Sequence, residues 1–134
     1  MLVKHVYLET LKENQTVISI VGAGKVGSSA AFSILGFRIS DVVLVDIAEN
    51  LASGEALDMM QAAPAIEFDG KIRGTSDYSQ MRGSDLVIVT AGEARKPGMS
   101  RMDLVNRNSK IVKAVVKEVV RCAPSCKLMI VTNP

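Results

Sequence analysis

Three glycines in the stretch GAGKVG follow the pattern G-x-G-x-x-G, at positions Gly22, Gly24 and Gly27. The stretch comes directly after a β-branched run and opens a run of small residues, which predicts a tight turn from a strand into a helix. Gly22 would permit the turn, Gly24 would let the backbone approach a ligand, and Gly27 would let the helix pack close to the sheet. Free N–H groups at the start of that helix would then hold the pyrophosphate of a dinucleotide.

Asp46 ends the next predicted strand, about twenty residues after the glycines. Its carboxylate is the expected acceptor for the adenosine ribose hydroxyls, and its charge would repel a 2′-phosphate. NAD is therefore favoured over NADP, and the adjacent Ile47 offers a phosphate no basic partner. On this motif alone, FAD is an alternative ligand, a free-standing domain that senses NAD is an alternative function, and a purely structural turn is a third interpretation.

A second candidate site lies in RKPGMSR, where Arg95, Lys96 and Arg101 surround a Pro-Gly pair. Pro97 and Gly98 cannot lie inside a helix, so this stretch predicts a loop. From the residues alone, solvated surface charge is the favoured interpretation of the three cations. The alternative is a loop that carries cations to an anionic ligand.

The rest of the sequence predicts the elements that would position these residues. Strands are expected at 16–22, 41–46, 70–76, 85–92 and 127–134, with helices at 25–36, 50–64 and 100–123. Strands that alternate with helices predict an α/β fold with a doubly wound parallel sheet, the Rossmann dinucleotide-binding fold. Thr90, Ala91 and Gly92 end the fourth strand, where such a sheet reverses its strand order and binds ligands.

Three helix ends carry capping signals. Gly36 is expected to close the first helix in a glycine cap. Asn50 is expected to cap the start of the second helix. Ser100, with Asp103 three residues later, predicts a capping box at the start of the third helix.

Composition limits the classes of function. The 134 residues suit one domain, which we place at 15–134 after a polar lead-in at 1–14, and the 48% of hydrophobic residues predict a packed core. A net charge of +2 with interspersed signs gives no nucleic-acid footprint, and no apolar run is long enough to span a membrane. We expect no metal site, because Cys122, Cys126 and the single histidine, His5, do not make a zinc ligand set. The lead-in lacks an apolar signal core, so the cytoplasm is the expected compartment.

The motifs GAGKVG, VDI, GEALD, TAG, RKPGMSR and VTNP together resemble the lactate/malate dehydrogenase family over residues 16–134. In that family the loop after the fourth strand closes over the substrate. The resemblance implies that Arg95 binds the distal carboxylate of malate or oxaloacetate. It implies that Arg101 polarises the substrate carbonyl in catalysis and that Asn133 contacts both substrate and cofactor. Pro97 and Gly98 would shape a mobile lid rather than a rigid turn.

The resemblance also implies a small-molecule dicarboxylate substrate, NAD as the cofactor and a homo-oligomeric parent enzyme. Together with the glycine motif, it implies NAD contacts at Gly22, Ala23, Gly24, Lys25, Val26, Gly27, Asp46, Ile47, Thr90, Ala91, Gly92, Asn108, Val131, Thr132 and Asn133.

The family's reaction further needs a histidine–aspartate pair and another arginine, which lie in a second domain after VTNP. This sequence ends at Pro134, and its only histidine is His5 in the lead-in. We therefore expect a fragment that lacks the sixth strand and the substrate domain, binds NAD weakly and turns over no malate. A lactate or other 2-hydroxyacid dehydrogenase of the same family is the alternative, which Arg95 disfavours.

Overall fold

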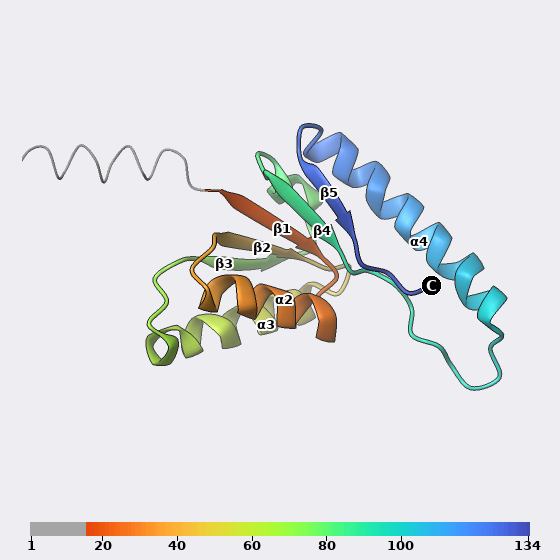
Figure 1. Ribbon diagram of the computed structural model, residues 1–134, viewed down its shortest axis with the longest axis horizontal. Coiled ribbons are helices and arrows are strands. Elements are labelled where there is room, and N and C mark those ends of the chain that lie inside the picture. Colours follow the sequence, from red (N-terminus) through yellow and green to blue (C-terminus); the bar gives the residue numbers. More distant parts are fainter. Residues whose placement is uncertain (1–15) are drawn as a thin grey trace, which may run out of the picture.

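The β-branched runs form strands and the segments between them form helices, as the sequence predicts (Figure 1). The computed structural model describes residues 16–134, so the predicted lead-in at 1–14 lies outside the described residues. In chain order the elements are β1 (Val17–Val21), α2 (Lys25–Gly36), β2 (Asp41–Val45), α3 (Glu49–Ala62), the 3₁₀ turn η1 (Ala63–Ile66), β3 (Ile72–Thr75), the 3₁₀ turn η2 (Tyr78–Met81), β4 (Leu86–Val89), α4 (Arg101–Cys122) and β5 (Lys127–Ile130).

All five strands are parallel and lie in the order β3-β2-β1-β4-β5. The central strand, β1, pairs with β2 on one side and β4 on the other, so Ser19 is in register with both Val43 and Val87. The chain builds the sheet outward to β3 and then crosses back to add β4 and β5. The strand order thus reverses between β1 and β4, where open α/β sheets bind ligands. This topology confirms the predicted doubly wound sheet.

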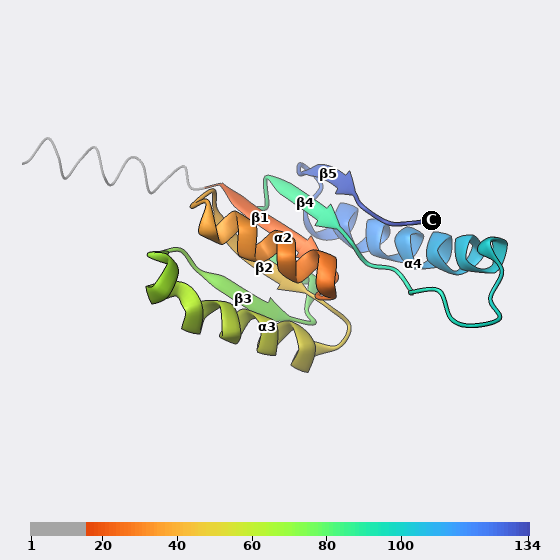
Figure 2. The same ribbon diagram turned by 60° about the horizontal axis from the view of Figure 1, so that its bottom comes forward.

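Helices cover both faces of the sheet. Figure 2 shows α2 and α3 on one face and α4 on the other. Side chains alternate along each strand, so the strands supply both cores. Ile20 and Leu44 belong to the cluster under α2 and α3, whereas Val89 packs in the cluster under α4 with Val115 and Val119. Full burial of a valine, leucine or isoleucine side chain contributes about 1.5–3 kcal/mol to the stability of the fold. This packing holds the strands, and therefore the loops at their ends, in place.

The C-terminus of α2 differs from the prediction. Gly36 is the last helical residue, and the left-handed conformation falls on Arg38, whose φ is 56°. The backbone N–H of Arg38 donates to Leu35 O at 2.9 Å, and that of Ile39 donates to Ile34 O at 3.0 Å. These bonds form a Schellman motif, which satisfies carbonyl groups at the end of the helix. The expectation of a glycine cap at Gly36 is therefore wrong.

The N-terminus of α3 also differs. The helix begins at Glu49, so Asn50 lies inside the first turn and is not the cap. The capping position is Ala48, which has no polar side chain to accept a hydrogen bond. Its own backbone N–H donates to Asp46 Oδ1 at 2.9 Å. A carboxylate from the end of β2 thus supports the start of this helix.

The N-terminus of α4 matches the prediction. Ser100 Oγ accepts the backbone N–H of Asp103 at 3.1 Å, and Asp103 Oδ2 accepts the backbone N–H of Ser100 at 3.1 Å. This reciprocal pair is a complete capping box. The basic loop that follows β4 therefore ends at a firmly capped helix.

Candidate functional site

Gly22 and Gly27 are glycines because the fold leaves no room for a side chain at either position. Gly22 has a φ of +112°, and a Cβ there would lie 2.7 Å from Thr90 Oγ1. A Cβ on Gly27 would collide with the carbonyl oxygen of Gly22, because α2 packs directly against the turn. Thr90 Oγ1 also donates a hydrogen bond to Gly22 O at 3.1 Å. These residues form the junction between β1, α2 and β4.

Gly24 differs from its two neighbours in the motif. A Cβ at this position would meet no atom within 4 Å, and its φ of −70° suits any residue. The packing of the described chain therefore does not require glycine here. Gly24 caps α2 without a side-chain hydrogen bond, and the first turn of the helix holds no acidic residue. An open backbone at an uncapped helix N-terminus fits a pyrophosphate, and the exposed residues Lys25 and Val26 flank the same opening.

Asp46 lies beside this turn and already holds part of it. Its Oδ2 accepts the backbone N–H of Ala23 at 2.7 Å, while Oδ1 accepts that of Ala48 at 2.9 Å. The half-buried carboxylate thus connects the end of β2 to the glycine turn and to the start of α3. Carboxylate oxygens have further lone pairs, so these two bonds leave room for ribose hydroxyls as additional donors. The adjacent Ile47 side chain is 87% exposed and presents no charge.

The ends of β4 and β5 are joined by hydrogen bonds. Thr132 Oγ1 donates to Ala91 O at 3.1 Å, and the backbone N–H of Val131 donates to Val89 O at 2.8 Å. A Cβ on Gly92 would lie 3.3 Å from the methyl group of Thr132, so the two segments approach closely. Beyond them, Asn133 is exposed at the same edge of the sheet. The predicted cofactor residues of both segments are thus brought to the edge that also carries the glycine turn.

Asn108, on α4, has a structural role that the sequence does not reveal. Its side chain is 1% exposed, with Oδ1 accepting the backbone N–H of Glu93 at 2.7 Å. Its Nδ2 donates to Glu93 O at 3.3 Å and to Pro134 O at 3.1 Å. Both donor hydrogens of the amide are therefore engaged by the backbone of the chain. Asn108 joins α4 to the ends of β4 and β5, and its contact with a cofactor stays a prediction.

The basic loop contains an ordered turn. The backbone N–H of Met99 donates to Lys96 O at 3.1 Å, with Pro97 and Gly98 between them. Gly98 has a φ of +81°, which a type II turn requires at its third residue, and proline suits the second. Arg95 Nε also donates to Met99 O at 3.0 Å. The tip of the loop thus has a defined turn, and its movement as a lid stays a prediction.

The three cations of the loop have different surroundings. Within the described chain, Arg95 donates a hydrogen bond only from Nε, so its two terminal NH₂ groups remain available to bind a carboxylate. Lys96 Nζ forms an ion pair with Glu93 Oε1 at 2.5 Å. The exposed guanidinium of Arg101, at the start of α4, forms no ion pair among residues 16–134. Two arginines are thus available to an anion, whereas the lysine is already paired.

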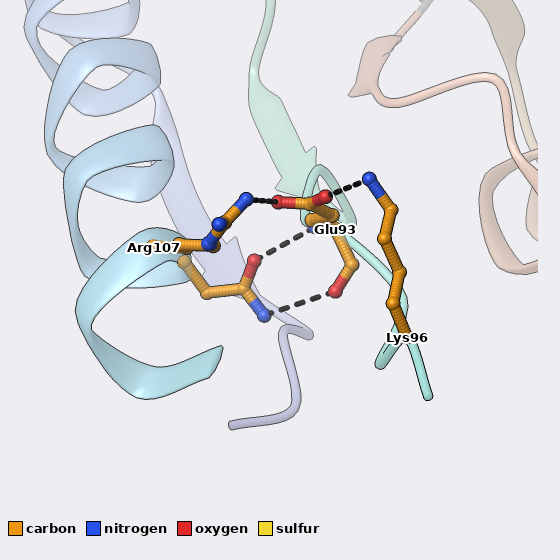
Figure 3. Close-up of polar contacts among 4 residues, drawn as sticks. Glu93, Lys96 and Arg107 are labelled. Carbon is orange, nitrogen blue, oxygen red and sulfur yellow. Dashed lines mark hydrogen bonds and ion pairs between the residues drawn. The ribbon is translucent and has the colours of Figure 1, made fainter. Parts of the chain in front are cut away.

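Glu93 is the site residue that sequence reasoning missed. Its carboxylate lies between Lys96 and Arg107, as Figure 3 shows, with Oε2 at 3.3 Å from Arg107 Nη1. Hydrogen bonds from Lys96, and then from Arg107, hold the pKa of Glu93 below its usual range. The three-residue spacing from Glu93 to Lys96 is a local signal that could have indicated the first pair. The contact with α4 has no local signal.

Among the described residues we looked for a metal site, a disulfide and a membrane-spanning helix. Within residues 16–134, no group of three or more histidine, cysteine, aspartate or glutamate side chains could hold a metal ion. Cys122 is buried and Cys126 half-buried, and both are free thiols. No helix of the described part has the length and apolar character needed to cross a membrane.

Comparison with known proteins gives one consistent family. The sequence profile described as "lactate/malate dehydrogenase, NAD binding domain" matches residues 16–134. A malate dehydrogenase of Geobacillus kaustophilus is 53% identical in an alignment of 119 residues that covers 87% of this chain and 38% of that protein.

Solved structures agree with the sequence comparison. The malate dehydrogenase of Picrophilus torridus in its apo form superposes with a TM-score of 0.86 at 42% identity, over 90% of this chain and 39% of that one. The malate dehydrogenase of Archaeoglobus fulgidus in complex with NADH gives a TM-score of 0.83 at 48% identity, over 89% of this chain and 41% of that one. The chain thus spans about two fifths of the length of these relatives.

Proposed function

The chain belongs to the lactate/malate dehydrogenase family, of which it carries the NAD-binding domain, and on that premise we propose that it is the cofactor-binding part of an enzyme that interconverts malate and oxaloacetate. One observation carries the proposal. The glycine turn leaves space for a ligand at Gly24. The basic loop of the same chain carries two arginines that are available to an anion, Arg95 and Arg101, one on each side of the Pro97–Gly98 turn.

The residues present fit NAD. The uncapped N-terminus of α2 offers N–H groups and positive dipole to the pyrophosphate, and Gly24 leaves space for it. Asp46, held in place by two backbone N–H groups, would accept the ribose hydroxyls and repel a 2′-phosphate. When bound, NAD supplies the hydride acceptor. The chain's part is to place the nicotinamide near the ends of β4 and β5, where the backbone is held by Thr132 and Asn108.

Arg95 and Arg101 would bind and polarise the substrate. Oxaloacetate has two carboxylates, and the free end of the Arg95 guanidinium can bind one of them through two parallel hydrogen bonds. Its orientation is set in advance by the bond from Nε to Met99 O. Arg101, without an ion pair in the described chain, would stabilise negative charge as it develops on the keto oxygen. Asn133 is proposed to contact substrate and cofactor from the end of β5.

The hydroxyl proton of malate needs a separate acceptor. Residues 16–134 contain no histidine, because the only one in the sequence is His5. We therefore expect the 134-residue chain to bind NAD and to show no malate-dependent reduction of NAD above the background rate. Oxidation of NADH by the purified chain in the presence of oxaloacetate would contradict this expectation.

The substrate class is tested by NMR of the chain saturated with NADH. Oxaloacetate should shift the Nε–H signals of Arg95 and Arg101, whereas pyruvate, which has one carboxylate, should shift that of Arg101 alone. In the Arg95→Gln variant the two acids should bind alike. Lys113→Gln, which removes an exposed lysine of α4 outside the loop, is the matched control that should keep the preference. Equal effects of both acids on Arg95 in the unaltered chain would remove the reason to prefer malate over lactate.

Two further expectations stay predictions. The parent enzyme is proposed to be a homo-oligomer that pairs through the helix holding Gly54–Asp58. The outer face of α2 and α3 supports this, because it carries a groove of about 420 Å³ beside the partly exposed Phe32. We also propose that the protein is located in the cytoplasm.

A further inference from the structure

We propose that Glu93 is a positioning residue that fixes the resting place of residues 95–99, called the lid from here on. The lid follows β4 and leads to α4, and Figure 1 shows that this connection extends away from the sheet. Its role as a substrate lid rests on the function proposed above. Its attachment to the body of the domain does not.

The base of the lid is fixed independently of its charges. Asn108 accepts the backbone N–H of Glu93 at 2.7 Å and donates to its carbonyl oxygen at 3.3 Å. Asn108 is buried on α4, so the backbone of Glu93 cannot shift without breaking both bonds. Glu93 is therefore a fixed point, and any movement of the lid must begin after it.

The tip of the lid is internally ordered. The turn closed by Met99 N–H on Lys96 O, together with the bond from Arg95 Nε to Met99 O, joins the two ends of the segment to each other. At its far end the lid meets Ser100, which is held in the capping box of α4. The lid is thus expected to move as one body between two fixed ends.

The lid has one polar attachment to its surroundings. A hollow of about 500 Å³ lies between the turn and the first part of α4, so side chains do not fill this space. Among residues 16–134, the pair from Lys96 Nζ to Glu93 Oε1, at 2.5 Å, is the only ion pair or hydrogen bond that joins residues 95–99 to a side chain outside them.

Glu93 is suited to this attachment because its own carboxylate is held on the other side. Arg107 Nη1, on α4, lies 3.3 Å from Oε2, so the carboxylate bridges α4 and Lys96 (Figure 3). The Glu93 side chain is 24% exposed, less than that of Lys96 at 66% or Arg107 at 57%. The pair from Lys96 to Glu93 therefore ties the lid to α4 in its resting place.

The test measures backbone order in the lid of the 134-residue chain without NAD or substrate. In the unaltered chain, the ¹⁵N order parameters of the lid amides should be typical of ordered backbone, about 0.85. In Glu93→Gln they should fall below about 0.6, because the neutral amide loses both ion pairs. Lys96→Gln should have the same effect, since it removes the pair from the other side. In 1 M salt the unaltered lid should approach the values of Glu93→Gln, which should itself change little.

Glu118→Gln is the matched control. Glu118 pairs with Arg121 at 2.6 Å near the other end of α4, so this variant makes the same charge change without touching the lid. Its lid should stay ordered. Unaltered order in both Glu93→Gln and Lys96→Gln would overturn the proposal. Because no ligand is present, this result is independent of whether the chain binds a dicarboxylate.

Discussion

Replacement of Asp46 by asparagine should weaken the domain and its affinity for NAD at the same time. In the structure, the two carboxylate oxygens accept backbone N–H groups from Ala23 at 2.7 Å and Ala48 at 2.9 Å. Asparagine keeps one acceptor and turns an NH₂ group toward the other N–H. One charge-assisted bond is lost and the other becomes a neutral one.

The magnitude follows from these bonds. A hydrogen bond to a charged group contributes about 1.5–3 kcal/mol, against about 1 kcal/mol for a neutral bond. We expect the free energy of unfolding to fall by about 2–5 kcal/mol, which for a chain of this size lowers the Tm by roughly 7–18 °C. The affinity for NAD should fall by about ten- to a hundredfold, because the ribose hydroxyls lose a charged acceptor.

The assays are urea unfolding followed by circular dichroism, and calorimetric titration with NAD. Asp85→Asn is the control, because Asp85 Oδ2 accepts the N–H of Val17 at 2.9 Å at the opposite edge of the sheet. It should lower stability without changing NAD affinity. If Asp46→Asn kept its full stability, the two backbone bonds would not matter. If it lost stability but kept its NAD affinity, the assigned contact with ribose would be wrong.

Further predictions concern the junction and the cap. Gly27→Ala should destabilise the domain by at least about 3 kcal/mol or prevent folding, because its Cβ would collide with the carbonyl oxygen of Gly22, and unfolding curves would show this. Ser100→Ala should lower the free energy of unfolding by about 1 kcal/mol through loss of the cap, measured in the same way. Hydrogen bonds from the Ser100 side chain, and then its backbone, hold the pKa of Asp103 below its usual range. The stabilisation by ionised Asp103 is therefore complete above about pH 4 and lost as the pH falls through the lowered pKa, so the difference between the unaltered chain and Ser100→Ala should shrink in acid. A difference that stays constant down to pH 2 would contradict this coupling.

The sequence predicts the sheet and the glycine turn because both depend on local patterns. The β-branched runs of β1, β2 and β4 form strands whose side chains pack into the cores on both faces of the sheet. The capping box at Ser100 needs only residues three apart. The parallel direction of the strands follows from the alternation of strands and helices with right-handed crossovers. The motif also predicts separate roles for its three glycines. The structure adds that a Cβ at Gly24 would meet open space, whereas one at Gly22 or Gly27 would collide with the fold.

The exact residues that end a helix and the contacts between distant segments could not be predicted. Arg38 takes the left-handed conformation that the sequence indicates for Gly36, because the hydrogen bonds of the Schellman motif close two residues later. Asp46 accepts the backbone N–H of Ala48, two residues later, so α3 starts before Asn50 and leaves it without a capping role. Glu93 meets Arg107 only because α4 runs back along the sheet beside the end of β4.

The most direct test of the central claim is a calorimetric titration of the 134-residue chain with NAD and NADP, alongside Gly24→Ala and Gly36→Ala. Both glycines have open space where a Cβ would stand, and both lie at ends of α2, so neither variant should impair folding. The unaltered chain and Gly36→Ala should bind NAD with equal affinity. Both should bind NADP at least about tenfold more weakly than NAD. Gly24→Ala should lose about tenfold or more in its affinity for NAD. Equal affinity of Gly24→Ala and the unaltered chain, or no preference for NAD over NADP, would contradict the account.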